Sequence, residues 1–241
     1  MEKVILKALS RRPEDRYVDI KAFRKDLDES VKAWDEHVIS YSNSVEPTIK
    51  NKDWIENLMM FYKEGEYKKA ELLLDNQIEI GNNSQDLVYH QAYVYTKQQR
   101  FYDGLKKIEE LDLSKVEEVR RAGFEDNVIY LKARLFVELK RYEEAKALYE
   151  KLCSNNLENV DYKYKLACVY ALNNEQHKAI EILEEINKKT PGLLYIVKKL
   201  GHAYDQVKNY SKARAYFNFS LRLDPNDETI RNRIDLYKKY L

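Results

Sequence analysis

The stretch Lys208-Asn209-Tyr210-Ser211-Lys212-Ala213 has a simple order: two polar residues, an aromatic residue, two more polar residues and a small residue. The same order returns in related form at residues 65–70, 99–104, 140–145 and 174–179. In chain order, the small residues that close the five stretches are separated by 34, 41, 34 and 34 residues. A fixed period in this range predicts a repeat protein whose structural units stack on their neighbours.

Three further columns of residues keep the same register. One column lies twelve residues before each closing small residue, an aromatic column follows three residues later, and a column of large residues comes late in each repeat. In chain order these columns are Leu58, Ala92, Ala133, Ala167 and Gly201; Phe61, Tyr95, Phe136, Tyr170 and Tyr204; and Leu74, Ile108, Tyr149, Leu183 and Phe217. An ordinary helical bundle with accidental periodicity would not keep all of these columns over five repeats.

This pattern resembles the tetratricopeptide repeat, a pair of helices with a period of 34 residues. The resemblance implies an all-α fold: a right-handed α-solenoid of five helix-turn-helix repeats over residues 51–227, starting near residues 51, 85, 126, 160 and 194. In that family the small residues lie where the two helices of a repeat approach most closely, and the aromatic residues fill the hairpin core. The fourth repeat departs from the pattern, because Gln176 stands where an aromatic residue begins the second helix.

Seven extra residues separate the second and third repeats, enough for about two helical turns. Ser114-Lys115-Val116-Glu117 has the form of a capping box, which marks the start of a helix. We therefore expect a lengthened helix near residues 114–139, bent at Gly123. The alternative is a plain loop insertion.

Residues 228–241 predict one more amphipathic helix. Its apolar face is Ile230, Ile234, Tyr237 and Leu241, and its polar face is Arg231, Asn232, Asp235 and Lys238. A solenoid needs a terminal element with a polar outer face, so this segment is expected to be a capping helix. A helix for self-association is the alternative.

Residues 1–36 are also helical in pattern but lie outside the repeat, and residues 37–50 lack helical periodicity and are expected to form a linker. The sequence Lys7-Ala8-Leu9, followed by Pro13-Glu14-Asp15-Arg16, resembles the end of a bacterial-type Ser/Thr protein kinase domain. In that family the arginine matched by Arg16 pairs with the glutamate of an Ala-Pro-Glu motif, which this chain lacks, as it lacks the kinase catalytic motifs. The segment is either the tail of a kinase domain or a plain helical hairpin that caps the solenoid.

Composition excludes several classes of protein. The 241 residues are 34% charged, yet 42 basic and 41 acidic residues nearly cancel, unlike the clustered positive charge of a nucleic-acid-binding domain. No apolar run is long enough for membrane insertion or a signal peptide. Cys153 and Cys168 lie in no metal-like cluster, and the four histidines are scattered. We expect a cytoplasmic protein with no catalytic, cofactor-binding or metal-binding residues.

What remains is a surface for a protein or peptide ligand. In tetratricopeptide repeats the first helix of each repeat lines a concave groove, and tyrosine recurs at the corresponding places here. The resemblance implies a partner-binding groove of Met59, Tyr62, Lys63, Tyr89, Tyr93, Lys97, Tyr130, Arg134, Tyr164, Lys198 and His202. Tyrosine offers a large contact area at a low cost in rotamer entropy.

The expected function is therefore a protein-protein interaction module, with the kinase resemblance making it the recruiting or regulatory region of a Ser/Thr protein kinase. The alternatives are a free-standing adaptor and a self-associating scaffold, neither with a kinase link. The groove residues suggest a peptide of mixed apolar and acidic character.

Overall fold

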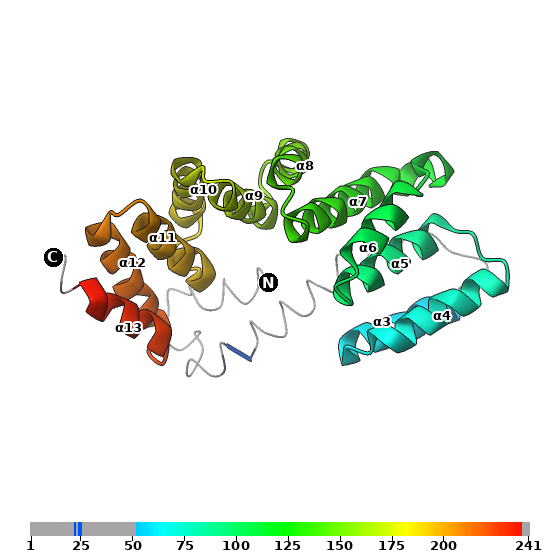
Figure 1. The fold of residues 1–241 in the computed structure, drawn as a ribbon, viewed down its shortest axis with the longest axis horizontal. Helices are drawn as coiled ribbons and strands as arrows, with labels where there is room; N and C mark the ends of the chain where they lie inside the picture. The colour runs from blue at the N-terminus through cyan, green and yellow to red at the C-terminus, as the bar shows by residue number, and fades with distance from the viewer. Residues whose placement is uncertain (1–21, 23, 26–51, 238–241) are drawn as a thin grey trace, which may run out of the picture. The chain divides into compact units, whose positions relative to one another are not determined.

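A computed structural model describes residues 22, 24–25 and 52–237, and in this part the chain forms α-helices joined by short turns, with no strand (Figure 1). The expectations for residues 1–36, including Arg16, for the linker at 37–50 and for Leu241 lie outside the described residues, apart from residues 22, 24 and 25, which are helical. The helices are α3 (Lys52–Glu64), α4 (Tyr67–Glu79), α5 (Gln85–Lys97), α6 (Phe101–Glu109), α7 (Glu118–Glu138), α8 (Tyr142–Asn155), α9 (Val160–Leu172), α10 (Gln176–Lys189), α11 (Leu194–Gln206), α12 (Tyr210–Leu223) and α13 (Glu228–Tyr237).

The chain divides into two compact units. Among the described residues, the first comprises residues 22, 24–25, 52–73 and Leu113–Asn127, and the second comprises Leu74–Asp112 and residues 128–237. In the second unit consecutive helices pack in pairs, α5 on α6, α9 on α10 and α11 on α12, and neighbouring pairs also pack, α8 on α9 and α10 on α11. This is the stacking expected of a solenoid, whose hairpins bury their apolar surface against their neighbours. The division into a linker, five repeats and a terminal helix stays a prediction.

Each helical hairpin turns at a single residue with a left-handed backbone. These residues are Gly65, Gln99, Lys140, Asn174 and Lys208, with φ between 59° and 71°. The amide of the next residue then donates to the carbonyl of the aromatic column, as from Arg141 to Phe136 at 2.7 Å and from Glu175 to Tyr170 at 2.8 Å. This bond is the hallmark of the Schellman motif, which satisfies the carbonyls at the helix end. The polar residues after the aromatic column are therefore the turn of the hairpin.

The predicted columns of small residues lie in the core. Ala92, Ala133 and Ala167 on the first helices are fully buried. The alanines that close the repeat stretches are equally buried, at positions 70, 145, 179 and 213. In the last repeat the small residue is Gly201, and a β-carbon there would lie 2.5 Å from Cδ1 of the buried Phe217 ring. Small side chains at these positions let the two helices of a hairpin approach closely.

Helix α13 packs against α12, where it closes the hydrophobic cluster of the last repeats. Ile230 and Tyr237 are 2% exposed, while Arg231, Asn232 and Asp235 face solvent. Arg233 of α13 also forms an ion pair with the buried carboxylate of Asp205 on α11. The helix therefore has the buried apolar side and polar outer side of a solenoid cap.

The lengthened helix is confirmed, but its predicted start is wrong. Helix α7 has 21 residues, against 13 in α5, and it begins at Glu118 rather than near Ser114. Leu113–Lys115 form a short 3₁₀ helix instead, after which Val116 is buried and its carbonyl accepts from Arg121 Nη2 at 3.0 Å. The burial of Val116 and the hydrogen bond from Arg121 to its carbonyl hold this segment in a turn before α7. The helix therefore does not begin at the capping-box sequence.

Replacing Gly123 with alanine is expected to stabilise the protein by about 0.5–1 kcal/mol, because glycine is a poor residue in a helix interior. A β-carbon at Gly123 would meet no described heavy atom within 4 Å, and α7 continues on both sides of the residue. Urea unfolding of the two proteins measures the difference. A loss of stability would show that α7 needs glycine here, for example for the predicted bend.

The described part of the chain contains no helix of the length and hydrophobicity needed to cross a membrane.

Candidate partner-binding surface

Tyrosines on successive first helices of the second compact unit contact one another. Tyr130 of α7 lies 5.7 Å from Tyr162 of α9 between ring centroids, and Tyr164 of α9 lies 4.9 Å from Tyr195 of α11. On α5, Tyr89 and Tyr93 lie one helical turn apart, and the pKa of Tyr89 is raised mainly by burial and to a smaller extent by Tyr93 and Tyr162. The tyrosine surface is defined here as Tyr89, Tyr93, Tyr130, Tyr162, Tyr164 and Tyr195, together with Arg134.

Helical spacing explains how each helix contributes to this surface. Tyr93 follows Tyr89 by four residues, and Arg134 follows Tyr130 by four. Residues four apart lie on the same side of a helix, one turn from each other. Stacking of the hairpins then brings the corresponding sides of α5, α7, α9 and α11 next to each other.

Tyr130 is held in place from two sides. Its hydroxyl donates to Asp161 Oδ2 at 3.0 Å, and its ring meets the buried Tyr149 ring edge-on at 5.9 Å. Burial is the main reason that the pKa of Tyr130 lies well above its ordinary value, and the negative charge of Asp161 adds to it. The phenol therefore stays protonated and links the third repeat to the fourth.

The end of the surface near α11 is more open. Tyr195 is 44% exposed and packs edge-on against Tyr164, at an interplanar angle of 83°. Burial raises the pKa of Tyr164, and the neighbouring Cys168 raises it further. Lys165 Nζ lies 5.7 Å from the Tyr164 ring centroid. A ligand can therefore reach aromatic faces here without displacing the core.

Two predicted residues near the C-terminus are already engaged within the chain. Lys198 Nζ lies 2.6 Å from Asp227 Oδ2 and 3.2 Å from Asp224 Oδ2, so two carboxylates neutralise its charge. His202 is exposed, and its ring meets Phe217 edge-on at 4.9 Å. These residues do not join the contacts of the tyrosine surface.

The remaining predicted residues fall into two places. Lys97 lies over the ring of Tyr93, 5.2 Å from its centroid, at the α5 end of the surface. Met59, Tyr62 and Lys63 belong to α3 in the first compact unit, where Tyr62 packs against Tyr67 at 6.2 Å. The predicted residues of α5, α7 and α9 therefore belong to the second compact unit, whereas those of α3 belong to the first.

Sequence reasoning missed Tyr162 and Tyr195. The contact of Tyr195 with Tyr164 repeats that of Asp161 with Tyr130, since each pair is separated by 31 residues, but this relation becomes visible only once the hydrogen bond between Tyr130 and Asp161 is known. Tyr162 has no sequence signal either, since it lies only two residues before Tyr164 and residues two apart do not share a helix face.

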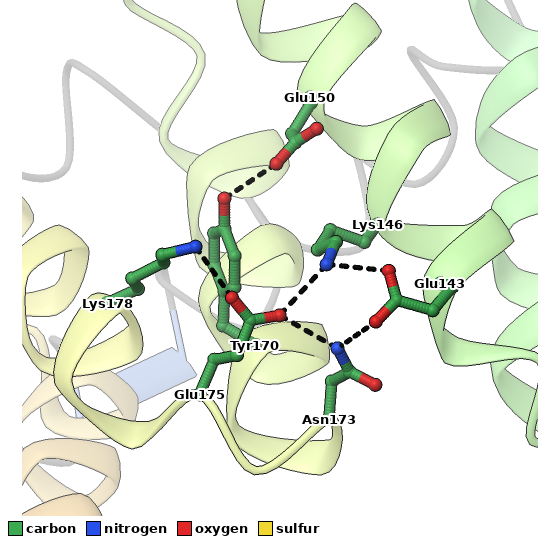
Figure 2. Close-up of polar contacts among 7 residues, drawn as sticks. All are labelled: Glu143, Lys146, Glu150, Tyr170, Asn173, Glu175 and Lys178. Atoms are coloured by element: carbon green, nitrogen blue, oxygen red, sulfur yellow. Dashed lines mark hydrogen bonds and ion pairs between the residues drawn. The ribbon is translucent and has the colours of Figure 1, made fainter.

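A second polar cluster joins α8 to the hairpin of α9 and α10 (Figure 2). Lys146 Nζ lies 2.7 Å from Glu143 Oε2 and 2.9 Å from Glu175 Oε1. Asn173 donates to the same two carboxylates, Lys178 pairs with Glu175, and the Tyr170 hydroxyl donates to Glu150 at 2.6 Å (Figure 2). Because the charged groups of this cluster are paired internally, it fixes the stacking of two repeats rather than offering a ligand site.

The pKa of Glu175 gives a direct test of this cluster. Hydrogen bonds from Lys178, Lys146 and Asn173 lower it to about 2. The carboxylate therefore stabilises the fold above its unfolded pKa of about 4.3, and this contribution is lost as the pH falls through about 2. Lys146→Met is expected to raise the pKa of Glu175, as followed by carbon-detected NMR titration. An unchanged pKa would mean that Lys146 does not hold this carboxylate in solution.

The described residues contain no group of three or more His, Cys, Asp or Glu side chains that could hold a metal ion.

Comparisons with known proteins agree with the helical hairpins. The family model "Tetratricopeptide repeat" matches residues 127–159 and 199–227. Cell division cycle protein 27 homolog A of Arabidopsis thaliana is 34% identical over 89 residues, which cover 37% of this chain and 12% of that protein. A DnaJ homolog subfamily C member 7 homolog of Dictyostelium discoideum is 28% identical over 143 residues, covering 51% of this chain and 25% of the relative. The chain thus spans a quarter or less of the length of these relatives.

Solved structures show the same architecture at low sequence identity. A MamA double mutant has a TM-score of 0.61 at 14% identity, covering 76% of this chain and 98% of the other. YrrB, described as a TPR protein with an unusual peptide-binding site, has a TM-score of 0.57 at 15% identity, covering 78% of this chain and 91% of the other. At such identities the likeness concerns the fold alone. Together with the hairpin geometry and the matched repeats, it establishes the fold of this chain as an α-solenoid of tetratricopeptide repeats.

Proposed function

We propose that this chain is a protein-protein interaction module that binds a peptide segment of its partner on the tyrosine surface. The observation that carries the proposal is the two ring contacts between neighbouring first helices, Tyr130 with Tyr162 and Tyr164 with Tyr195, with Tyr195 exposed. Tyrosine is enriched at protein interfaces, where one ring gives apolar contact and its hydroxyl gives a hydrogen bond. The peptide-binding site named for YrrB, a protein of the same fold, agrees with this proposal.

A variant with Tyr164→Ala and Tyr195→Ala tests the surface. Peptides selected on the wild-type protein from a random 12-residue display library are expected to bind this variant at least about tenfold more weakly, because truncating buried aromatic anchors costs about 2 kcal/mol. Fluorescence anisotropy measures the affinities, and circular dichroism checks the fold. Tyr102→Ala is the matched control, since Tyr102 is 78% exposed on α6. Equal binding by the folded double variant would place the ligand elsewhere.

We further propose that the module is the recruiting region of a Ser/Thr protein kinase. This rests on the resemblance of residues 3–34 to the end of such a domain, with Arg16 as the matching arginine. An antibody to the repeats should then detect a native protein larger than 28.8 kDa by about 30 kDa, the size of one catalytic domain. A band at 28.8 kDa would favour the free-standing adaptor.

Self-association is the second alternative. The outer side of α13 carries Arg231, Asn232 and Asp235, a polar surface that favours a cap over an end-to-end contact. Light scattering should therefore give the mass of one chain, and a concentration-dependent mass would favour a self-associating scaffold.

A cytoplasmic location is also proposed, from the two unpaired cysteines Cys153 and Cys168, and cell fractionation tests it.

A further inference from the structure

Arg134 of α7 lies among the phenol groups of the tyrosine surface. Its positive charge acts on Tyr89 of α5, on Tyr130 of α7 and on Tyr149 of α8, and in each case it opposes the rise in pKa that burial causes. Arg134 also follows Tyr130 by four residues, so the two side chains lie on the same side of α7, one helical turn apart. It is itself partly buried.

Within residues 52–237, Arg134 forms no hydrogen bond or ion pair with another described side chain. Glu138, one turn further along α7, does not approach it closely enough to pair. Asp161, whose carboxylate lies beside Tyr130, accepts from the Tyr130 hydroxyl. By contrast, Lys198 is held between two aspartates. Arg134 is thus a cation beside tyrosine rings, with no counter-ion among the described side chains.

We infer that the peptide bound by the tyrosine surface carries an aspartate or glutamate side chain that pairs with Arg134 while its apolar neighbours lie on the tyrosines. This inference rests on the proposed function and names the chemistry of its ligand. Arginine suits the role, because its planar donors match the two oxygens of a carboxylate. A peptide lying on the tyrosines would exclude water from Arg134, which strengthens a charged hydrogen bond.

The charges favour a carboxylate over a phosphate. Arg134 supplies one positive charge, and the negative Asp161 stands on the same surface, next to Tyr130. A phosphoryl group carries nearly two negative charges at neutral pH, so it would need further cations beside Arg134. The other cations of the surface, Lys97 and Lys165, lie over the rings of Tyr93 and Tyr164, and Lys198 is neutralised by Asp224 and Asp227. A single carboxylate matches the single arginine.

Matched peptide libraries test the inference. Each contains acetylated and amidated 12-residue peptides, so that no chain-terminal carboxylate contributes, with flanking positions randomised among Leu, Phe, Pro, Ser and Lys. The fixed central residue is glutamate in the first library, glutamine in the second and phosphoserine in the third. Wild-type protein is expected to retain the glutamate library about tenfold better than the glutamine library, as for a charge-assisted hydrogen bond.

Two variants assign that preference to one residue. The Arg134→Met variant should retain the glutamate library only as well as the wild type retains the glutamine library. The Arg214→Met variant, changed at an exposed position on α12, should keep the wild-type preference for glutamate. Equal retention by the wild type, a preference that persists in Arg134→Met, or tighter binding of the phosphoserine library would overturn the inference while leaving the proposed function intact. Failure to retain any of the libraries would overturn both.

Discussion

Replacing Gly201 with alanine is expected to destabilise the last repeats by about 1–3 kcal/mol, the usual cost of overpacking a tight core. The new methyl group would lie 2.5 Å from Cδ1 and 3.0 Å from Cζ of Phe217. That ring is fully buried, with His202 edge-on at 4.9 Å and Tyr237 stacked at 6.3 Å, so it has little room to move. The better helix propensity of alanine offsets only about 1 kcal/mol of the strain.

A second substitution separates packing strain from other causes. The fourth repeat combines Ala167 with Leu183 at the corresponding two positions, both of them buried. The double variant with Gly201→Ala and Phe217→Leu should therefore lose less stability than the two single changes added together, by about 1 kcal/mol. Urea unfolding measures all three, and Gly123→Ala is the control at a glycine with open space around it. Additive losses would contradict the packing proposed for this repeat.

The buried histidine His90 is expected to make the fold strongly sensitive to acid. It is 6% exposed in α5, and burial lowers its pKa to about 4, with Asp86 opposing the shift. Its ordinary pKa is 6.5, so between these values the unfolded chain binds the proton more readily than the folded one. The contribution of His90 to the free energy of unfolding is therefore fully present above pH 6.5, and about 3 kcal/mol of it is lost as the pH drops to about 4.

A comparison of variants isolates this contribution from the titration of carboxylates. The free energy of unfolding of His90→Gln should lack this part of the pH dependence, while His177→Gln, at an exposed site, should follow the wild type. Urea titrations at pH 7.5, 6, 5 and 4 give the three profiles. Parallel profiles for wild type and His90→Gln would show that His90 is protonated in the folded protein without cost.

The repeat columns made most of the fold predictable. A buried small residue such as Ala133 and a hairpin turn at Lys140 both follow from a fixed register, because every repeat must solve the same packing problem. The start of α7 did not follow, since it depends on the burial of Val116 and on its carbonyl accepting from Arg121. This contact occurs at a single place in the chain, so the repeat pattern does not predict it.

The candidate surface was predictable only in outline. Position within the repeat singled out Tyr89, Tyr130 and Tyr164. It could not show that Tyr130 donates a hydrogen bond to Asp161 of the next repeat, nor that Lys198 pairs with two aspartates. Those pairings depend on how adjacent hairpins stack, and one repeat in isolation does not encode them.

The central claim is that ligands bind on the tyrosine surface, and NMR of fluorotyrosine-labelled protein tests it most directly. A peptide selected on the wild-type protein would be titrated in, with the resonances assigned by single Tyr→Phe variants. The account predicts that the signals of Tyr164 and Tyr195 shift with the same affinity as binding, while that of the exposed Tyr102 on α6 stays in place. Shifts at Tyr102 with Tyr164 and Tyr195 unmoved would contradict it.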